Sequence, residues 1–278
     1  MSVQTWFITG ASSGFGEALA LSALAAGHRV AATARDKSRL CTLRSAYPDA
    51  VLPLAMDLTK PEEIGQAIAA AEAWSGGIDI LVNNAGIGYM AAVEEGQDEN
   101  IRKLFETNFF GVASTIRAAL PAMRKRGRGI IVNVSSVAGV VAFPAFGYYS
   151  ASKFALEGLS ESLHDEVGPL GIKVMAIEPG GFRTGIVERN LRSPRIPGYE
   201  STVHALMDMF LADETGTLAP GDPKRMADII VQLVNSGSLP RRLILGTDSW
   251  DAIMAKESAQ KAEYDAYREV AQSTYFDN

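Results

Sequence analysis

Cysteine is almost absent from this sequence: Cys41 is the only one among 278 residues, so no disulfide can form within the chain. The N-terminus also lacks a basic segment followed by an apolar one, which is the pattern of a secretory signal. Together these absences predict a reducing, cytoplasmic location. No apolar run approaches the roughly 18 residues that a membrane-spanning helix needs, so we expect no membrane association.

Clusters of positive charge and of metal ligands are missing as well. Lys and Arg are spread along the chain and the formal net charge is -6, which argues against nucleic acid or anionic lipid as a partner. The three histidines, His28, His164 and His204, have no cysteine or carboxylate at metal-ligand spacing. We therefore expect no bound metal.

Apolar residues, in contrast, are plentiful and follow a regular pattern. Short β-branched runs alternate with longer helical stretches, and the alternation predicts strands over residues 5–9, 29–34, 51–56, 78–83, 129–135, 172–179 and 241–246. This order is typical of βαβ units. It predicts an α/β fold: a single-domain, Rossmann-type, doubly wound parallel sheet of about seven strands, flanked by helices on both faces. One domain is expected over residues 1–278.

Two segments depart from this alternation. Residues 181–222 are rich in Pro, Gly and Arg and contain one short amphipathic stretch, so we expect an insertion that serves as a substrate-binding loop or lid. Residues 248–272 predict a charged C-terminal helix that docks through Trp250, Ile253 and Met254.

A glycine loop, TGASSGFG, lies between the first predicted strand and its helix. Such a loop lets backbone approach a dinucleotide diphosphate at a helix N-terminus, although a glycine turn between strand and helix is also a common structural device. The absence of a following Lys-Ser or Lys-Thr disfavours a P-loop NTPase. The residues expected to bind cofactor here are Gly10, Ser12, Ser13, Gly14, Phe15 and Gly16.

The end of the second strand indicates which dinucleotide is bound. Arg35 offers a donor fork that suits a ribose 2′-phosphate, so NADP(H) is favoured over NAD(H). Asp36 keeps the alternative open, because an aspartate close to this position can bind the unmodified ribose of NAD(H).

The segment YYSASK supplies candidate catalytic groups. Tyr149 and Lys153 are one helical turn apart and share a face, while Tyr148 pairs at that spacing only with Ser152. Ser136 ends the fifth predicted strand, at the edge where parallel sheets bind ligands. These positions indicate Tyr149, rather than Tyr148, as the reactive tyrosine.

Taken together, these motifs resemble the short-chain dehydrogenase/reductase family, in particular an NADP(H)-preferring, ketoreductase-like member with a long C-terminal tail. The matching elements cover about the first two-thirds of the chain, in the family's order and spacing. They are Thr9-Gly10-x-x-x-Gly14-x-Gly16, Asp57, Asn83-Asn84-Ala85-Gly86, Asn108, Ser136, Tyr149-x-x-x-Lys153, Pro179-Gly180 and Thr184.

The resemblance implies a role for each catalytic residue. Tyr149 would be the general acid or base, and Lys153 would stabilise its phenolate and bind the nicotinamide ribose. Ser136 would hydrogen-bond the substrate oxygen. Asn108 would hold a water that links Lys153 to solvent, and a helix-kinking residue that bonds to backbone is compatible with the same position.

The resemblance also implies where the cofactor lies. Asp57 and Leu58 would contact the adenine, although Asp57 also suits an N-cap. Backbone of Asn84, Ala85 and Gly86 would approach the adenine-side ribose. The residues that would line the nicotinamide are Pro179, Gly180 and Thr184.

The implied function is hydride transfer between NADP(H) and a small carbonyl or secondary alcohol. Residues 185–220, with Met90, Phe143 and Phe146, would form an apolar pocket, although lid packing accounts for them equally well. The alternatives are epimerase or dehydratase chemistry, and a nonenzymatic NADP(H) sensor or scaffold. The resemblance implies a homodimer or homotetramer assembled through the helices that carry Asn108 and Tyr149. The long C-terminal helix resembles members that are not all tetramers, so the choice of assembly stays open at this point.

Overall fold

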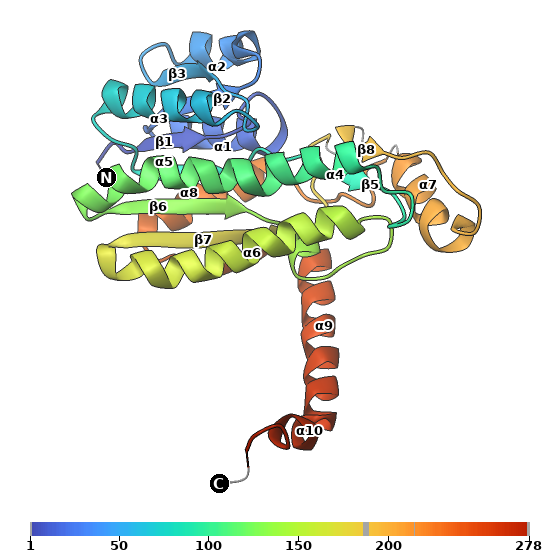
Figure 1. The fold of residues 1–278 in the computed structure, drawn as a ribbon. Helices are drawn as coiled ribbons and strands as arrows, with labels where there is room; N and C mark the ends of the chain where they lie inside the picture. Colours follow the sequence, from blue (N-terminus) through green and yellow to red (C-terminus); the bar gives the residue numbers. More distant parts are fainter. Residues whose placement is uncertain (1, 186–188, 214, 277–278) are drawn as a thin grey trace.

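Seven parallel strands form the main sheet of the computed structural model, which describes residues 2–185, 189–213 and 215–276. The strand order is β3-β2-β1-β4-β6-β7-β9 (Figure 1). The bounds are β1 (Thr5–Ile8), β2 (Arg29–Ala34), β3 (Val51–Ala55), β4 (Ile80–Asn83), β6 (Gly129–Val134), β7 (Ile172–Pro179) and β9 (Arg242–Leu245). The predicted α/β class and its seven strands are confirmed.

The strand order reverses between β1 and β4. The chain builds outward from β1 to β3 and then adds β4 on the other side of β1. Such a switch point leaves a crevice at the carboxyl ends of the two strands. The glycine loop follows β1 and Asn84 follows β4, so two of the predicted cofactor motifs meet there.

Helices cover both faces of the sheet. One face packs on α1 (Gly14–Ala25) and α8 (Pro223–Ser236), and the other on α3 (Pro61–Ser75), α5 (Gly111–Arg126) and α6 (Gly147–Val167). In β1, Trp6 belongs to the first core and Phe7 to the second, as the alternation of side chains along a strand requires. Burial on both faces explains why these strands are continuous apolar runs.

Shorter elements connect these layers. The 3-10 turns are η1 (Lys37–Leu40), η3 (Val137–Gly139) and η4 (Gly168–Leu170), and the short helix α2 (Cys41–Ala46) follows η1. The helical segment before β6 is not uniform: α4 (Asp98–Phe105) continues into a π-helical turn, η2 (Glu106–Phe110), and then into α5. A π turn changes which residues face inward, and such turns often occur at functional sites.

The predicted insertion, residues 181–222, is called the cap below. Its two ends are joined, because the amide of Gly221 donates to the carbonyl of Gly181 at 2.9 Å. The cap contains β8 (Leu191–Arg192), the π turn η6 (Glu200–His204) and α7 (Ala205–Leu211). β8 pairs in parallel with β5 (Tyr89–Met90), so the cap is seated beyond the carboxyl edge of the main sheet (Figure 1).

The C-terminal helix is present but does not dock as expected. It comprises α9 (Thr247–Ala266) and α10 (Arg268–Gln272), and α9 extends away from the sheet (Figure 1). Ile253 is buried, but Trp250 is 54% exposed, so the expectation that Trp250 anchors the helix was wrong. Ser249 is buried in its place and donates to the carbonyl of Glu178. No helix in the described part of the chain is both long enough and apolar enough to span a bilayer.

Candidate active site

The glycine loop is held in place from the neighbouring strand. Gly10 and Gly14 have φ of 67° and 59°, a region that favours glycine. The Asn84 side-chain amide donates to the carbonyl of Thr9 at 2.8 Å, and the Thr9 hydroxyl accepts from the amides of Asn84 and Ala85, each at 2.9 Å. The side chain of Asn84 therefore holds the glycine loop in place. The backbone of Asn84 is the part that the predicted contact with the adenine-side ribose would use.

The N-terminus of α1 is suited to an anion. Ser13 is the N-cap residue, but its side chain makes no capping hydrogen bond, and the first-turn amides have no partner within the helix. A Cβ on Gly16 would lie 2.4 Å from the Asn84 amide nitrogen, so only glycine fits there. Phe15 is buried in the core, and its side chain is not available to a ligand. These features fit a dinucleotide diphosphate, which would be held by Ser12, Ser13 and backbone amides.

Arg35 and Asp36, the two predicted partners of the adenine-side ribose, follow β2 and have different surroundings. Arg35 is exposed directly after the strand. The Asp36 carboxylate accepts hydrogen bonds from the amide and hydroxyl of Ser38, at 2.9 and 2.7 Å. These bonds to Ser38 lower the pKa of Asp36. The aspartate therefore caps η1 in the structure, while Arg35 is exposed and lies within electrostatic reach of the Asp57 carboxylate.

Asp57 and Leu58 follow β3. Asp57 accepts from the amide and hydroxyl of Thr59, at 2.9 and 2.8 Å. Leu58 is 6% exposed and packs against Gly111, where an added Cβ would lie 2.7 Å from the Leu58 Cβ. The Leu58 side chain is therefore part of the core, and only its backbone is available for the predicted adenine contact.

Asn108 lies in the π turn and is 1% exposed. Its carboxamide accepts from the amide of Ile87 at 2.9 Å and donates to the carbonyl of the same residue at 2.8 Å. It also donates to the Ser152 hydroxyl at 3.1 Å, which donates to the carbonyl of Tyr149 at 2.7 Å. Asn108 thus joins the segment after β4 to α6. The sequence alone gave no signal for Ser152, whose residue type is common on helices.

Ser136, Tyr149 and Lys153 come together at the carboxyl edge of the sheet. The Ser136 side chain lies close enough to the Tyr149 phenol to lower its pKa, and it accepts from the amide of Ala138 at 3.1 Å. The Lys153 amine lies 5.8 Å from the centre of the Tyr149 ring and donates to the carbonyl of Val134 at 2.8 Å. Gly86 is next to this group, because an added Cβ there would lie 3.8 Å from the Lys153 amine.

Burial has the largest effect on the pKa values of Tyr149 and Lys153. It raises the pKa of Tyr149, and the Ser136 side chain opposes the rise. Burial also lowers the pKa of Lys153 to about 8, against the opposing effect of Glu157. The sequence-based expectation was a phenol made more acidic by Lys153; in the protein itself desolvation outweighs that effect. Tyr149 is therefore protonated at neutral pH, as a proton donor must be.

The neighbouring tyrosine has a different environment. The Tyr148 hydroxyl donates to the carbonyl of Val93 at 2.7 Å, and its ring stacks on Tyr89 with the centroids 5.8 Å apart. Gly96 leaves the space that the ring occupies, since an added Cβ would lie 2.4 Å from it. Tyr148 is thus engaged in packing, in line with its predicted secondary role.

Pro179 is the last residue of β7, and Gly180 and Thr184 lie in the loop that follows it. Gly180 leaves room for the Asp248 carboxylate, which accepts from the amide of Gly181 at 2.7 Å. Thr184 packs on the glycine loop: an added Cβ on Gly14 would lie 2.9 Å from the Thr184 carbonyl oxygen. Thr184 is therefore placed beside the glycine loop. The support from Asp248 was not foreseen, because it lies in the C-terminal helix outside the family motifs.

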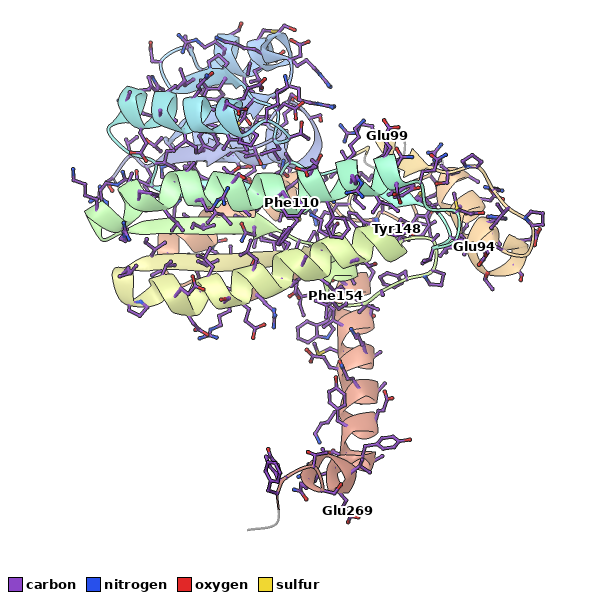
Figure 2. All side chains as sticks on the ribbon, in the orientation of Figure 1. Glu94, Glu99, Phe110, Tyr148, Phe154 and Glu269 are labelled. Atoms are coloured by element: carbon purple, nitrogen blue, oxygen red, sulfur yellow. The ribbon has the colours of Figure 1, made fainter. Side chains whose placement is uncertain are left out.

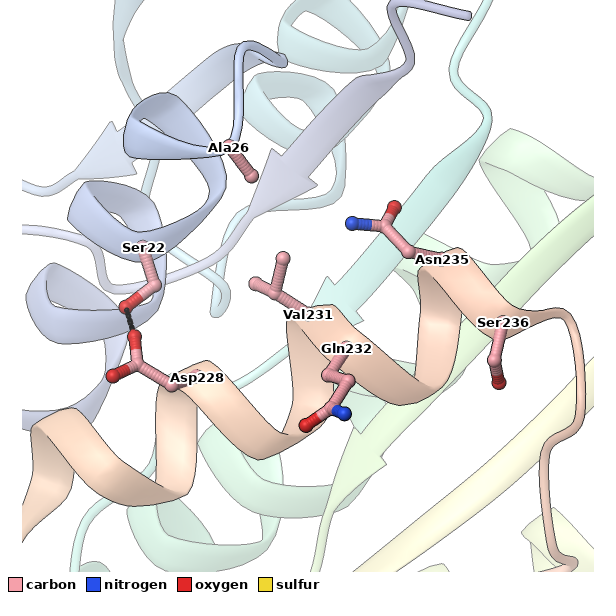
Figure 3. A pocket seen from close by; sticks show the side chains of 7 residues that line it. All are labelled: Ser22, Ala26, Asp228, Val231, Gln232, Asn235 and Ser236. Carbon is pink, nitrogen blue, oxygen red and sulfur yellow. Dashed lines mark hydrogen bonds between the residues drawn. The ribbon is translucent and has the colours of Figure 1, made fainter. Parts of the chain in front are cut away.

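A surface cavity elsewhere on the molecule contains none of these residues. It has a volume of about 420 Å³ and lies between α1 and α8 (Figure 3). The only polar contact drawn across it joins the Ser22 hydroxyl and the Asp228 carboxylate, which are 2.7 Å apart.

Residues 2–185, 189–213 and 215–276 contain no group of three or more histidine, cysteine, aspartate or glutamate side chains that could hold a metal ion.

Comparisons with known families and solved structures agree with the observed fold. The family model described as short chain dehydrogenase matches residues 4–194. The chain belongs to the short-chain dehydrogenase/reductase family. A 3-ketodihydrosphingosine reductase from Bacteroides thetaiotaomicron is 43% identical over 192 residues, which are 69% of each chain. A short-chain dehydrogenase structure from Streptomyces avermitilis has a TM-score of 0.90 and 41% identity, and the match covers 99% of this chain and 100% of that one.

Solved members of this short-chain dehydrogenase/reductase family hold both kinds of nicotinamide cofactor. A short-chain dehydrogenase from Burkholderia cenocepacia, 25% identical with a TM-score of 0.74, is in complex with NADP; the match covers 95% of this chain and 97% of that one. A 3-ketoacyl-(acyl-carrier-protein) reductase from Brucella melitensis, 26% identical with a TM-score of 0.74, is complexed with NADH, and 88% and 96% are covered. Similarity alone does not choose between the cofactors.

Proposed function

We propose that this protein is a cytoplasmic, NADP(H)-dependent reductase of apolar ketones that also oxidises the corresponding secondary alcohols. The observation that carries the proposal is the group formed by Ser136, Tyr149 and Lys153 at the carboxyl edge of the sheet, next to a loop built for a dinucleotide diphosphate. When bound, a nicotinamide cofactor supplies or accepts the hydride. A sensor or scaffold function would not require this complete set.

In the direction of reduction, Tyr149 donates its phenolic proton to the carbonyl oxygen. Its raised pKa keeps that proton in place until negative charge develops on the oxygen. Ser136, which lies beside the phenol, stabilises the same charge. Lys153 stabilises the phenolate that remains, and it is held in position by the carbonyl of Val134.

Asn108 acts in this scheme through its neighbours. Its bonds to Ile87 and Ser152 hold the segment after β4 against α6, which keeps Gly86 beside the Lys153 amine. A water-linked proton path from Lys153 to solvent, as the family resemblance implies, is part of the proposal.

The NADP(H) preference rests on Arg35 and Asp36. Arg35 is exposed, so its guanidinium can meet a 2′-phosphate, whereas the Asp36 carboxylate already accepts two hydrogen bonds from Ser38. Arg35→Ala is expected to raise the Kd for NADPH by about 10- to 100-fold, the value of a charge-assisted hydrogen bond, and to leave that for NADH nearly unchanged. An equal effect on both cofactors would contradict the assignment.

The preference for apolar substrates rests on the side chains beside Tyr149. The Phe146 ring is 6.5 Å from the Tyr149 ring and 5.4 Å from that of Phe210. Phe146 and Phe210 pack against a buried cluster that includes Met90 and Met207. The name of the Bacteroides relative specifies a ketone on a long aliphatic chain, which agrees with such a wall.

We further propose that the chain forms a homodimer through the outer faces of η2, α5 and α6. Phe110 is 51% exposed and Phe154 is 40% exposed on this side of the molecule (Figure 2). Light scattering should show a dimer, and Phe110→Glu should shift it toward the monomer.

The central test is a panel of aliphatic ketones of increasing chain length, assayed separately with NADPH and NADH. We expect oxidation of NADPH, with kcat/KM rising with chain length, and a weaker reaction with NADH. Tight binding of NADPH without turnover of any carbonyl or alcohol would favour the nonenzymatic alternative. No binding of either cofactor would overturn the proposal.

A further inference from the structure

An arginine of the cap reaches back to the glycine loop. Arg189 follows the loop after β7, and its guanidinium donates to the Ser13 hydroxyl at 2.8 Å. It also donates to the carbonyls of Thr184 and Gly185, each at 2.7 Å. One planar group thus joins the N-terminus of α1 to the first residues of the cap. The family motifs described above do not include this position.

The charge of Arg189 is not neutralised by these contacts. All three acceptors are uncharged, and within residues 2–185, 189–213 and 215–276 no carboxylate forms an ion pair with it. A guanidinium has five N–H donors, so the three bonds to described residues leave donors for a further acceptor. The side chain is exposed, and extra donors can reach a ligand without movement of the core.

Its surroundings favour an anion in particular. The N-terminus of α1 carries a partial positive charge, and its first-turn amides are not capped by Ser13. A guanidinium next to this terminus is a second positive group, so an anion that contacts both is stabilised by both. Thr184 already lies against Gly14, which places the Arg189 contacts on the phosphate-binding loop itself and not at the Arg35 end of the crevice.

We propose that Arg189 binds the diphosphate of the dinucleotide and thereby fixes the beginning of the cap over the bound cofactor. This inference rests on the proposed function, because it requires a dinucleotide in the crevice. The ligand group is the diphosphate that NADPH and NADH share, whereas Arg35 meets the 2′-phosphate that only NADPH carries. Arg189 therefore contributes affinity for both cofactors, and Arg35 contributes selectivity.

The test measures binding of NADPH and of NADH by isothermal titration calorimetry at two salt concentrations. Arg189→Ala should raise both Kd values by the same factor, about ten-fold, and should weaken their dependence on salt. Arg189→Lys keeps the charge but not the fork, so it should recover part of the loss. Arg183→Ala is the matched control: Arg183 lies in the same loop, but its side chain donates to the carbonyl of Ala219, near the C-terminal end of the cap. Its Kd values should match those of the unaltered protein.

Three results would overturn the inference. If both Kd values stay unchanged in Arg189→Ala, the bond to Ser13 is only a surface contact. If NADPH alone is affected, Arg189 belongs to the 2′-phosphate site. If Arg189→Ala and Arg183→Ala weaken binding equally, the effect comes from loosening of the loop. Failure of the unaltered protein to bind either cofactor would instead count against the proposed function.

Discussion

The proposed catalytic group, formed by Ser136, Tyr149 and Lys153, and the cap are held by different kinds of contact. Around Tyr149, positions are set by regular elements and by bonds to backbone: Lys153 donates to the carbonyl of Val134, and Asn108 bonds to both backbone groups of Ile87. Among the described residues of the cap, 181–185, 189–213 and 215–222, only the two residues of β8 pair as a strand with the rest of the protein. Most of the cap's other polar contacts involve side chains.

The centre of these cap contacts is a buried carboxylate, Glu95. It accepts from the amides of Ile196 and Ala92, at 2.9 and 2.8 Å, and from His204 at 2.6 Å. Burial would raise the pKa of Glu95, but the bonds from Ile196, His204 and Ala92 together keep it below its ordinary value. Glu95 is therefore ionised at neutral pH, and one side chain ties η6 and the preceding cap loop to the segment after β5.

Under the proposed function, this difference in contacts separates the residues that take part in hydride transfer from the residues that bind the substrate. Catalytic groups fixed by backbone stay in register when loops change, because their supports belong to the sheet and its helices. A cap held by a few side chains can be altered by single substitutions. Changes at the sheet edge should therefore lower turnover, while changes in the cap should alter stability and substrate affinity.

The largest effect is expected at the sheet edge, from Tyr149→Phe. Removing the phenolic hydroxyl removes the proton donor, so kcat for ketone reduction should fall by about 10²- to 10⁴-fold. The Kd for NADPH should change little, because the ring remains. Tyr148→Phe is the matched control, since it removes a hydroxyl that donates only to the carbonyl of Val93. Similar losses of kcat in the two variants would refute the assignment of Tyr149.

Much of the sheet edge could be predicted from sequence, because its signals are local. The spacing of Tyr149 and Lys153 follows from one helical turn, and the glycine loop lies between a strand and its own helix. Support from distant residues has no such signal. Glu95 and His204 are 109 residues apart, and a lone glutamate and histidine are common in loops and helices. Strands of two residues, such as β5 and β8, are too short to show periodicity.

The second effect concerns the cap. Glu95→Ala leaves His204 and two amides without their acceptor, so the free energy of unfolding should fall by about 3 kcal/mol. The KM for ketones should rise, while the Kd for NADPH should not. Glu94→Ala is the control, because Glu94 is exposed and accepts only from the Tyr199 hydroxyl. Chemical denaturation and steady-state kinetics provide the measurements. A lower kcat at an unchanged KM would contradict the division between chemistry and cap.

A third prediction returns to the sheet and concerns pH. Burial, and next the nearby Glu157, raise the pKa of Glu178 to about 7. Between the ordinary pKa of a glutamate and about 7 the folded state binds more protons than the unfolded state, so Glu178 stabilises the fold at low pH and loses this contribution as pH rises through 7.

Glu178→Gln should therefore gain stability relative to the unaltered protein between pH 5 and pH 8, by about 1–2 kcal/mol after allowance for screening and for Arg242. Thermal unfolding across this pH range tests it. The control is Glu161→Gln, because Glu161 meets the same arginine with a side chain that is 60% exposed. Parallel pH curves for Glu178→Gln and the unaltered protein would contradict the prediction.

The smallest effect is expected where the two regions touch. Phe210 of the cap contacts Phe146, which in turn contacts Tyr149. Since an aromatic pair contributes about 1 kcal/mol, Phe210→Ala should raise the KM for long-chain ketones by about three- to ten-fold. The kcat for a short ketone should not change, because Ser136 and Lys153, the groups nearest the Tyr149 phenol, lie outside the cap. Met209→Ala, at a position that is 47% exposed on the same helix, should leave both constants unchanged. If Phe210→Ala instead lowers kcat for short and long ketones alike, the cap helps to orient Tyr149 through Phe146, and the two regions form one catalytic unit.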